Sequence, residues 1–440
     1  MRLLHAADLH LGKTLHERDL LADQAHMLEA LLKAAAAEKP AAILVAGDLY
    51  DRSVPPPEAL RLFDAFLNRV QALDRELAVV VIPGNHDSAA RLSFGAGLLA
   101  RAGLHLRTRP EECAQPLVLQ RGGERLALFA LPFLNPGAFP PRAGGGEAGG
   151  AAAGRPGAAA VQPGSAASAG AAAGGPGGAA RPARSDGGPG LFDEPPPPLR
   201  SQGELFGEAM RRIGGRLDEG AYNVLLAHCF AAGCSGSESE RAFVGAAELV
   251  DAALLDPFDY AALGHLHRPQ AAGAKGRYPG SPLAYAFSEG EEGGRGFLSV
   301  ELGPGGFEAR LVPVEPLRRL RRVEGPFERL AAPGAYPEFR GDFVEARLTD
   351  EFPVLDPADP LKANFPNLLS VRQAAFEIRP AGQGPEGSAE APAGRGAEGG
   401  AGAALADFEA FHLEMRGSPP DAETAALFAE LLAEAELAAR

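Results

Sequence analysis

A short apolar run that ends in Gly84-Asn85-His86-Asp87 is the feature that most constrains the fold of this chain. The run covers residues 78–82, is rich in β-branched side chains and stops at a Pro-Gly pair. This pattern is typical of a buried parallel strand that ends at the C-terminal edge of its sheet. Open α/β sheets place their chemistry at that edge. Because the turn supplies an amide oxygen, an imidazole and a carboxylate, we expect metal or phosphate chemistry there.

Short apolar runs alternate with helical patterns along most of the chain. This alternation predicts a layered domain of the α/β (α+β) class over residues 1–315. The expected elements are strands at 2–7, 41–46, 78–82, 126–131, 222–227 and 258–263, helices at 18–37, 58–73 and 204–213, and a hairpin of 296–302 with 308–312.

Composition divides the rest of the chain. Residues 143–198 are largely Gly, Ala, Pro and Ser, so they lack the large apolar groups that offset ordering entropy, and we expect a disordered insertion. Residues 316–380 predict a small α+β domain, residues 381–403 a low-complexity linker, and residues 404–440 two helices with apolar stripes. The elements expected in the small domain are strands at 343–348 and 368–372 and a helical segment at 357–362.

The charge balance excludes a global attraction to nucleic acid. With 57 acidic and 42 basic side chains the formal charge is −15, so polyanion binding must come from a local patch, a metal cluster or a partner. Three cysteines without zinc-type spacing argue against a disulfide framework. The first residues turn polar too soon for a signal peptide, and no stretch is apolar for the roughly 18 residues of a membrane span. We expect a cytoplasmic protein without a membrane partner.

Five short polar stretches each follow a predicted strand. Singly each is a weak signal, because a lone histidine after a strand is usually structural and a Gly-Asp turn is common. Together they place carboxylates, imidazoles and one amide at the same edge of a sheet, which is enough for two divalent metals. The stretches are Asp8-Leu9-His10, Gly47-Asp48-Leu49-Tyr50-Asp51, Gly84-Asn85-His86-Asp87, Leu226-Ala227-His228 and Gly264-His265-Leu266-His267.

This order of motifs, DxH, GDxxD, GNHD, a lone His and GHxH, resembles the calcineurin-like metallophosphoesterases. The resemblance implies a four-layer β-sandwich flanked by helices, with a dinuclear Mn²⁺ centre at the strand ends. It implies a first metal held by Asp8, His10 and His267, a second held by Asn85, His228 and His265, and Asp48 as the bridge between them. His86 is implied to stay off the metals and to face the substrate phosphate as the catalytic residue.

The chemistry of the side chains supports these roles independently. Two cations about 3.5–4 Å apart activate a water and neutralise charge in an in-line displacement. A bridging ligand needs two oxygens, which Asp48 has and an imidazole lacks. An imidazole such as that of His86 can donate a proton to the leaving alkoxide, because imidazoles titrate near neutrality. Mixed nitrogen and oxygen ligands suit Mn²⁺, with Mg²⁺, Fe or Zn²⁺ as alternatives.

Two further carboxylates belong to the same motifs. Asp51 and Asp87 are candidates for the second shell, where a carboxylate accepts the outer N–H of a ligating histidine. A turn or helix-cap role is equally open for each of them.

Finer residues separate branches of this superfamily. Protein phosphatases carry GDxxDRG and GNHE, whereas Ser53 and Asp87 stand at the last positions of these motifs here. The chain instead resembles the SbcD family of bacterial DNA exonuclease subunits, counterparts of the eukaryotic nuclease of double-strand-break repair. The stretches that carry this resemblance are 5–13, 45–51, 235–241, 259–270 and 278–282.

The resemblance to SbcD also implies partners. Residues 316–380 would form a DNA-capping domain, residues 404–440 would dock on the ATPase subunit SbcC, and two copies would form a homodimer through their nuclease domains, giving a nucleoid-associated heterotetramer. ATP would enter only through SbcC. The stretch Gly12-Lys13-Thr14 is no P-loop, because Ala7 stands where the leading glycine is needed and the stretch overlaps the metal motif.

Other polar residues have two interpretations each. Arg318, Arg319, Arg321 and Arg322 form the densest basic cluster, which predicts either DNA phosphate contacts or a solvated, charged edge strand. His16, just past the first metal motif, is a further candidate for substrate contact, whereas His5 is expected to be buried and hydrogen-bonded.

Three functions follow from these observations. The favoured function is a Mn²⁺-dependent DNA nuclease of repair and recombination, acting as an exonuclease on duplex ends and an endonuclease on single strands or hairpins. The alternative is a metallophosphoesterase for small phosphoesters or cyclic nucleotides. The second alternative is an inactive scaffold for SbcC, against which the complete ligand set argues.

Overall fold

The computed structural model describes residues 1–139, 199–237, 239–240, 249–291 and 294–373, together with residues 408, 420, 421, 424, 425, 427 and 428. Contacts divide the chain into a unit Met1–Glu377 and a unit Ile378–Arg440. The expected insertion at 143–198 and linker at 381–403 lie outside the described residues, as do the helices expected at 404–440 apart from the single positions named above.

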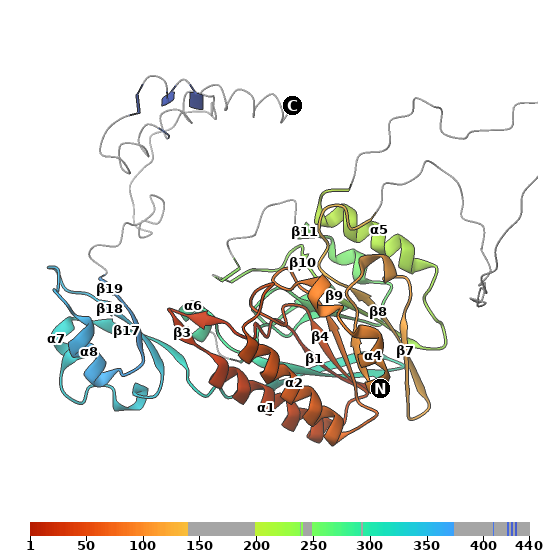
Figure 1. The fold of residues 1–440 in the computed structure, drawn as a ribbon, viewed down its shortest axis with the longest axis horizontal. Coiled ribbons are helices and arrows are strands. Elements are labelled where there is room, and N and C mark those ends of the chain that lie inside the picture. The colour runs from red at the N-terminus through yellow and green to blue at the C-terminus, as the bar shows by residue number, and fades with distance from the viewer. Residues whose placement is uncertain are drawn as a thin grey trace, which may run out of the picture. The chain divides into compact units, whose positions relative to one another are not determined.

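Six strands form the first sheet (Figure 1). They are, in spatial order, β16 (Gly306–Pro313), β15 (Gly296–Gly303), β1 (Arg2–Ala6), β4 (Ala42–Ala46), β5 (Ala78–Ile82) and β6 (Leu104–Leu106). Strands β1, β4, β5 and β6 run parallel, and β15 and β16 add an antiparallel hairpin. Strands β4 and β5 are buried along their full length, which is why both are continuous apolar runs.

Six more strands form the second sheet. They are, in spatial order, β13 (Gln270–Ala272), β14 (Gly276–Tyr278), β12 (Tyr260–Gly264), β9 (Tyr222–His228), β8 (Glu124–Leu131) and β7 (Leu117–Arg121). The central strands β14, β12, β9 and β8 are parallel, and each edge strand is antiparallel to its neighbour. In each sheet the carboxyl ends of the parallel central strands therefore lie along one edge, as the sequence predicts.

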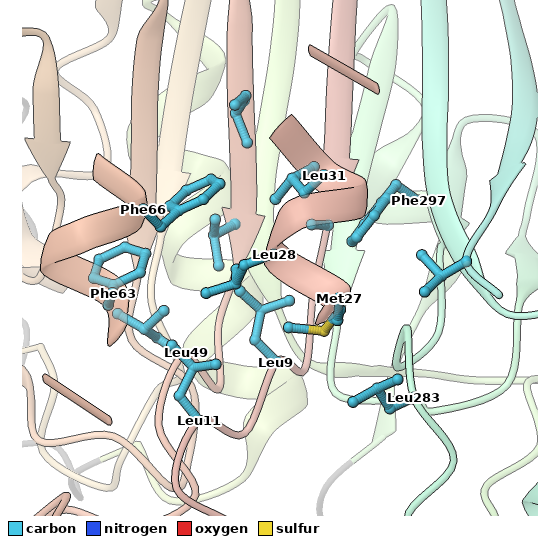
Figure 2. Packing of buried hydrophobic residues seen from close by; sticks show 14 of the residues in the cluster. Leu9, Leu11, Met27, Leu28, Leu31, Leu49, Phe63, Phe66, Leu283 and Phe297 are labelled. Carbon is cyan, nitrogen blue, oxygen red and sulfur yellow. The ribbon is translucent and has the colours of Figure 1, made fainter. Parts of the chain in front are cut away.

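Helices cover the outer faces of the two sheets (Figure 1). Helices α1 (Leu21–Glu38) and α2 (Pro57–Leu73) pack on the first sheet, and α5 (Gln202–Gly214) packs on the second. Figure 2 shows side chains of the α1 and α2 layer, including Met27 and Phe66, in the core against the first sheet. A separate apolar cluster fills the space between the sheets. The order helix, sheet, sheet, helix confirms the predicted four-layer fold.

Two elements begin two or more residues later than predicted, for local reasons. The helix expected from residue 18 begins at Leu21, because β3 (Arg18–Asp19) pairs with β2 (Thr14–Leu15) and the Asp19 carboxylate accepts the Leu21 N–H. The strand expected from residue 258 begins at Tyr260, because Phe258 belongs to the turn after the 3₁₀ helix Ala252–Leu255, where its N–H donates to the Leu255 carbonyl at 3.2 Å. Other short elements are α3 (Ala89–Leu92), α4 (Ala96–Leu99), β10 (Phe230–Ala231), β11 (Leu249–Val250) and α6 (Phe287–Glu291).

The segment expected to be a capping domain has its own small core. Its three parallel strands are β17 (Leu320–Gly325), β18 (Phe343–Leu348) and β19 (Leu368–Gln373), joined through helices α7 (Phe327–Ala331) and α8 (Ala358–Asn364). Strand β17 carries the arginine cluster for which a charged edge strand is one of the two interpretations, but its bounds are not predicted, because Leu320 and Val323 are three residues apart and give no period-two apolar pattern. In the parts of the chain that the structure describes, no helix is long and apolar enough to cross a membrane.

Candidate metal centre

The predicted ligands lie at the carboxyl ends of strands from both sheets. Asp8 and His10 follow β1, Asp48 follows β4, Asn85 and His86 follow β5, His228 ends β9, and His265 and His267 follow β12. The first sheet thus supplies both carboxylates, the amide and the His10 imidazole, while the second supplies three imidazoles. Neither sheet carries a complete set.

Gly264 allows the two sheet edges to approach, and Gly84 allows two neighbouring loops of the first sheet to pack together. A Cβ atom on Gly264 would lie 1.7 Å from the Ala46 carbonyl oxygen, and one on Gly84 would lie 2.1 Å from Asp48 Oδ1. Both distances are far below van der Waals contact, so any side chain at either position would push the loops apart. The glycines of the GNHD and GHxH motifs therefore serve the close packing of the ligand loops.

Four ligand residues adopt left-handed backbone angles. The φ values are 54° for Asp8, 44° for His10, 48° for Asp48 and 109° for His265. Such angles are strained for residues other than glycine and tend to occur at functional sites. Loop hydrogen bonds hold them, because the Asp8 N–H donates to the Gly47 carbonyl at 3.1 Å and the His10 N–H to the Asp48 carbonyl at 2.9 Å.

The first group of predicted ligands is compact. Ligand atoms of Asp8, His10 and His267 lie within 4.8 Å of one another, and all three residues are buried. The two Nε2 atoms of His10 and His267 are 3.1 Å apart. Asp48 Oδ2 lies 3.7 Å from His10 Nε2.

The second group converges on the amide of Asn85. Its Oδ1 lies 2.9 Å from His228 Nε2 and 3.1 Å from His265 Nδ1. Asp48 Oδ2 lies 3.7 Å from His228 Nε2, so one oxygen of this carboxylate faces both groups. The other oxygen, Oδ1, accepts the His86 N–H at 2.9 Å. This differs from the expectation that a bridge uses both oxygens, since Oδ1 is engaged by the loop.

Outer hydrogen bonds assign the tautomers of two ligands. His228 Nδ1 lies 2.8 Å from the Ala46 carbonyl, and His267 Nδ1 lies 2.8 Å from Ser239 Oγ and 3.3 Å from Glu289 Oε1. Because a carbonyl and a carboxylate only accept, both rings carry their proton on Nδ1. Their Nε2 lone pairs then point into the centre, which is how second-shell groups prepare a histidine for a metal.

These donors fit a divalent cation. The Nε2 lone pair of His228 faces the Asn85 oxygen, and the Nε2 lone pair of His267 faces the His10 ring. Lone pairs that face one another in this way repel unless a cation lies between them. Burial lowers the pKa of His10 to about 4 and that of His265 to about 3, so both rings are neutral ligands at pH 7. Burial and the Asp48 carboxylate raise the pKa of Asp8. Cations held among these atoms would remove the repulsion between the facing lone pairs and the repulsion between the Asp8 and Asp48 carboxylates.

His86 sits apart from the buried ligands. Its side chain is 30% exposed, its Nδ1 lies 2.9 Å from the Asp51 carbonyl, and its Nε2 lies 3.9 Å from Asp48 Oδ2. The ring is also within reach of a cation held by His10 and Asp48. With its Nδ1 proton given to a carbonyl, its Nε2 side is the one that faces the centre.

The two candidate outer carboxylates differ in their contacts. Asp51 Oδ1 lies 3.5 Å from the Nδ1 of His10, an atom with no hydrogen bond of its own, and accepts from Lys13 Nζ at 2.7 Å. Asp87 instead accepts the backbone N–H groups of Leu49, Tyr50 and Gly84 at 2.9–3.0 Å. These hydrogen bonds stabilise the loop that follows Asp48, which is the turn role that the sequence leaves open for Asp87.

The residues that support His267 have no role in the sequence-based prediction. Glu289, from α6, is buried and its carboxylate also accepts the Tyr285 N–H at 2.8 Å and a hydrogen bond from Ser237 Oγ at 2.7 Å. Glu240 accepts the His267 N–H. Burial alone would raise the pKa of Glu289, but His267 and Arg295 outweigh burial and lower it. The Ser-rich stretch 235–241 is a signal for some of these residues, whereas nothing local marks Glu289.

The arginine cluster is paired with acidic groups. Arg318 forms a bidentate ion pair with the buried Asp23 of α1, at 3.1 and 2.5 Å. The other pairs are Arg319 with Glu315, Arg321 with Asp342 and Arg322 with Glu345. Strand β17 lies at the edge of its sheet, so the structure has the features of the charged edge strand. His16 is exposed and lies near α6, where its ring is 5.8 Å from that of Phe287. The DNA contacts of these residues stay a prediction.

Comparison with known proteins agrees with this centre. Residues 1–131, which include Asp8, His10, Asp48, Asn85 and His86, match the family of calcineurin-like phosphoesterases. The D subunit of the nuclease SbcCD from Staphylococcus saprophyticus is 26% identical to this chain over 380 residues, which is 86% of each protein. The crystal structure of TT1561 from Thermus thermophilus matches with a TM-score of 0.35 and 14% identity over 70% of this chain and 98% of that one, which is too distant to support an argument.

Proposed function

Because the chain belongs to the SbcD family of calcineurin-like phosphoesterases, which are metal-dependent hydrolases, we propose that it is the nuclease subunit of an SbcCD-type complex. It hydrolyses phosphodiester bonds of DNA in repair and recombination, as an exonuclease on duplex ends and an endonuclease on single strands or hairpins. The observation that supports this proposal most is that the six other predicted ligands, from two sheets, gather around the Asp48 carboxylate, whose Oδ2 lies 3.7 Å from both His10 Nε2 and His228 Nε2.

Two Mn²⁺ ions are the proposed cofactors. Asp8, His10 and His267 would hold one, Asn85, His228 and His265 the other, and Asp48 would contact both. Bound there, the ions would polarise the phosphate and supply an activated water for in-line displacement. Mg²⁺ is the alternative, although the predominance of imidazole donors favours Mn²⁺ over Mg²⁺.

The residues of the chain prepare this chemistry. Burial lowers the pKa of the ligands His10, His228 and His265, and hydrogen bonds fix the directions of the ligand loops. His86, held by the Asp51 carbonyl through Nδ1 and facing Asp48, is placed to donate a proton from Nε2 to the leaving oxygen of the scissile phosphate when both of its ring nitrogens are protonated. Its partial exposure leaves it open to a substrate, unlike the fully buried ligands.

The test is cleavage of end-labelled duplex DNA by the purified protein with Mn²⁺ or with EDTA. We expect cleavage with Mn²⁺ only, and a loss of at least about 10²-fold in the His86→Ala and Asp48→Ala variants. Asp48→Ala should also lose bound Mn²⁺, whereas His86→Ala should keep it. A wild-type protein that leaves DNA intact even with SbcC and ATP, yet hydrolyses a chromogenic phosphodiester, would instead be a phosphoesterase for small substrates.

The proposed assembly is a heterotetramer of two copies of this chain with SbcC, located in the cytoplasm. Residues 404–440 are proposed to dock on SbcC, which alone supplies ATP hydrolysis. Among their described residues, Phe408 and Phe428 stack with ring centroids 4.1 Å apart and Leu427 is exposed. Unchanged co-purification with SbcC after truncation at residue 403 would contradict this docking site.

A further inference from the structure

Lys13 lies at the rim of the metal centre. It lines the same small cavity as His10, Asp48, His86 and His267. Lys13 belongs to the stretch Gly12-Lys13-Thr14, which resembles part of a P-loop but is not one. No function has therefore been assigned to this lysine. Among the described side chains that line the cavity, Lys13 is the one lysine or arginine.

A tight turn directs Lys13 back towards the centre. The Lys13 N–H donates to the His10 carbonyl at 3.0 Å, and Gly12 has a φ of 86°, which a side chain would strain. The buried Gln24 of α1 braces the turn by accepting the Gly12 N–H at 2.8 Å and donating to the His10 carbonyl at 2.7 Å. The position of Lys13 is therefore tied to that of the metal ligand His10.

The ammonium group is held but not saturated. Nζ donates to Asp51 Oδ1 at 2.7 Å and lies 5.3 Å above the ring of Tyr285. The side chain is 19% exposed. An ammonium has three N–H donors, and the Asp51 contact uses one, so donors remain for a group that enters the cavity.

A phosphodiester is the group that this arrangement suits. During displacement at phosphorus, negative charge spreads over the equatorial oxygens. A fixed cation beside them stabilises that charge without reorganisation. Carboxylates, imidazoles, an amide and the Ser239 hydroxyl line the remainder of the cavity, and these groups hold or orient the metals rather than bring positive charge to the substrate.

We propose that Lys13 is a catalytic residue whose ammonium binds a non-bridging oxygen of the scissile phosphate. This inference rests on the proposed phosphodiesterase function and adds a specific substrate contact to it. The Asp51 carboxylate orients the ammonium group, and the turn at Gly12 fixes the position of the Lys13 backbone beside the metal centre.

The test compares Lys13→Met and Lys13→Arg with Lys33→Met, which removes the same charge from an exposed position of α1. We expect Lys13→Met to lower kcat/KM by about 10²-fold on both DNA and a chromogenic phosphodiester, and Lys13→Arg to recover most of that loss. Lys33→Met should match the wild type, and Mn²⁺ binding should be equal in all variants.

A second readout does not depend on turnover. In the His86→Ala background, binding to a short single strand should become less salt-dependent with Lys13→Met, the slope of log K against log[salt] shrinking by about 0.7, which corresponds to one phosphate contact. An unchanged slope, or a loss of activity that follows a loss of Mn²⁺, would overturn the inference by reducing Lys13 to a support for Asp51. Wild-type inactivity on DNA would count against the proposed function alone, because the chromogenic substrate still tests Lys13.

Discussion

A histidine presents a lone pair to a metal only when its other nitrogen is occupied, and this structure solves that problem with three kinds of acceptor. His228 uses the Ala46 carbonyl, His267 uses Ser239 and Glu289, and His10 faces Asp51. The acceptors come from different elements, so the orientation of each histidine ring depends on how the neighbouring elements pack. The carboxylate of Glu289 is the strongest of these acceptors, because it is charged and buried.

Replacing Glu289 with Gln should therefore weaken one metal more than the other. The amide keeps the size of the side chain but removes the charge that fixes the His267 tautomer, and we expect Mn²⁺ affinity at one site to fall about 10–100-fold. Isothermal titration of the EDTA-treated protein measures both affinities. Glu301→Gln, which removes an exposed carboxylate on β15 paired with Arg2, is the control. Two unchanged affinities would show that Glu289 is only structural.

His5 makes a separate prediction about pH. It is buried between Tyr260 OH at 2.8 Å and the Leu263 carbonyl at 3.1 Å, as expected from the sequence, and burial lowers its pKa to about 3. An unfolded histidine titrates near 6.5, so below that pH the unfolded chain binds a proton that the folded chain refuses. The contribution of His5 to stability is therefore present above about pH 6.5 and falls as the pH drops from there towards 3.

The measurement is urea unfolding of the wild type and of His5→Leu across this pH range. Relative to His5→Leu, the wild type should lose roughly 1.4 kcal/mol of unfolding free energy per pH unit below about pH 6. Taking the difference cancels the other titrating groups. A difference that stays constant from pH 7 to 4 would contradict the burial of a neutral His5.

At the scale of elements, the sequence is informative wherever a strand is buried on both faces. The runs at β4 and β5 predict their strands within a residue, and the turns after them predict which side chains share an edge. Short, mixed strands such as β13 and β14 carry no such pattern, so the sequence predicts no strand at either place. The sequence also does not predict how the two sheets pack against each other, so the closeness of Gly264 to Ala46 is seen only in the structure.

The small domain shows the same limit. The sequence predicts its buried strand β18 without error in the bounds, whereas an edge strand at the arginine-rich β17 is only one of two interpretations and has no predicted bounds. Its strands are joined by helices as parallel crossovers, so the domain alternates strand and helix instead of segregating them. Contact partners such as Asp23 for Arg318, 295 residues apart in sequence, cannot be inferred from composition.

At the scale of the whole molecule, an exposed apolar patch supports the proposed homodimer. Phe94 is 88% and Leu98 72% exposed, on the short segment α3–α4 that follows the GNHD turn. Because the two side chains lie close together in the sequence, we propose them as part of the homodimer interface. Phe94→Asp with Leu98→Asp should convert a dimer to a monomer in sedimentation experiments while leaving Mn²⁺ binding intact. Val118→Asp, an exposed apolar position on β7, is the control, and a double variant that stays dimeric would place the interface elsewhere.

The division of ligands between the two sheets has a consequence for how the protein is made. His10 is 257 residues from His267, and Asp8 is 257 residues from His265, so the last ligand emerges from the ribosome only after central strands of both sheets have been synthesised. A nascent or prematurely terminated chain holds the carboxylates of the first sheet without all the imidazoles of the second. No fragment that ends before residue 267 carries the full set of predicted ligands, so we expect a chain truncated there to bind less metal than the full-length protein.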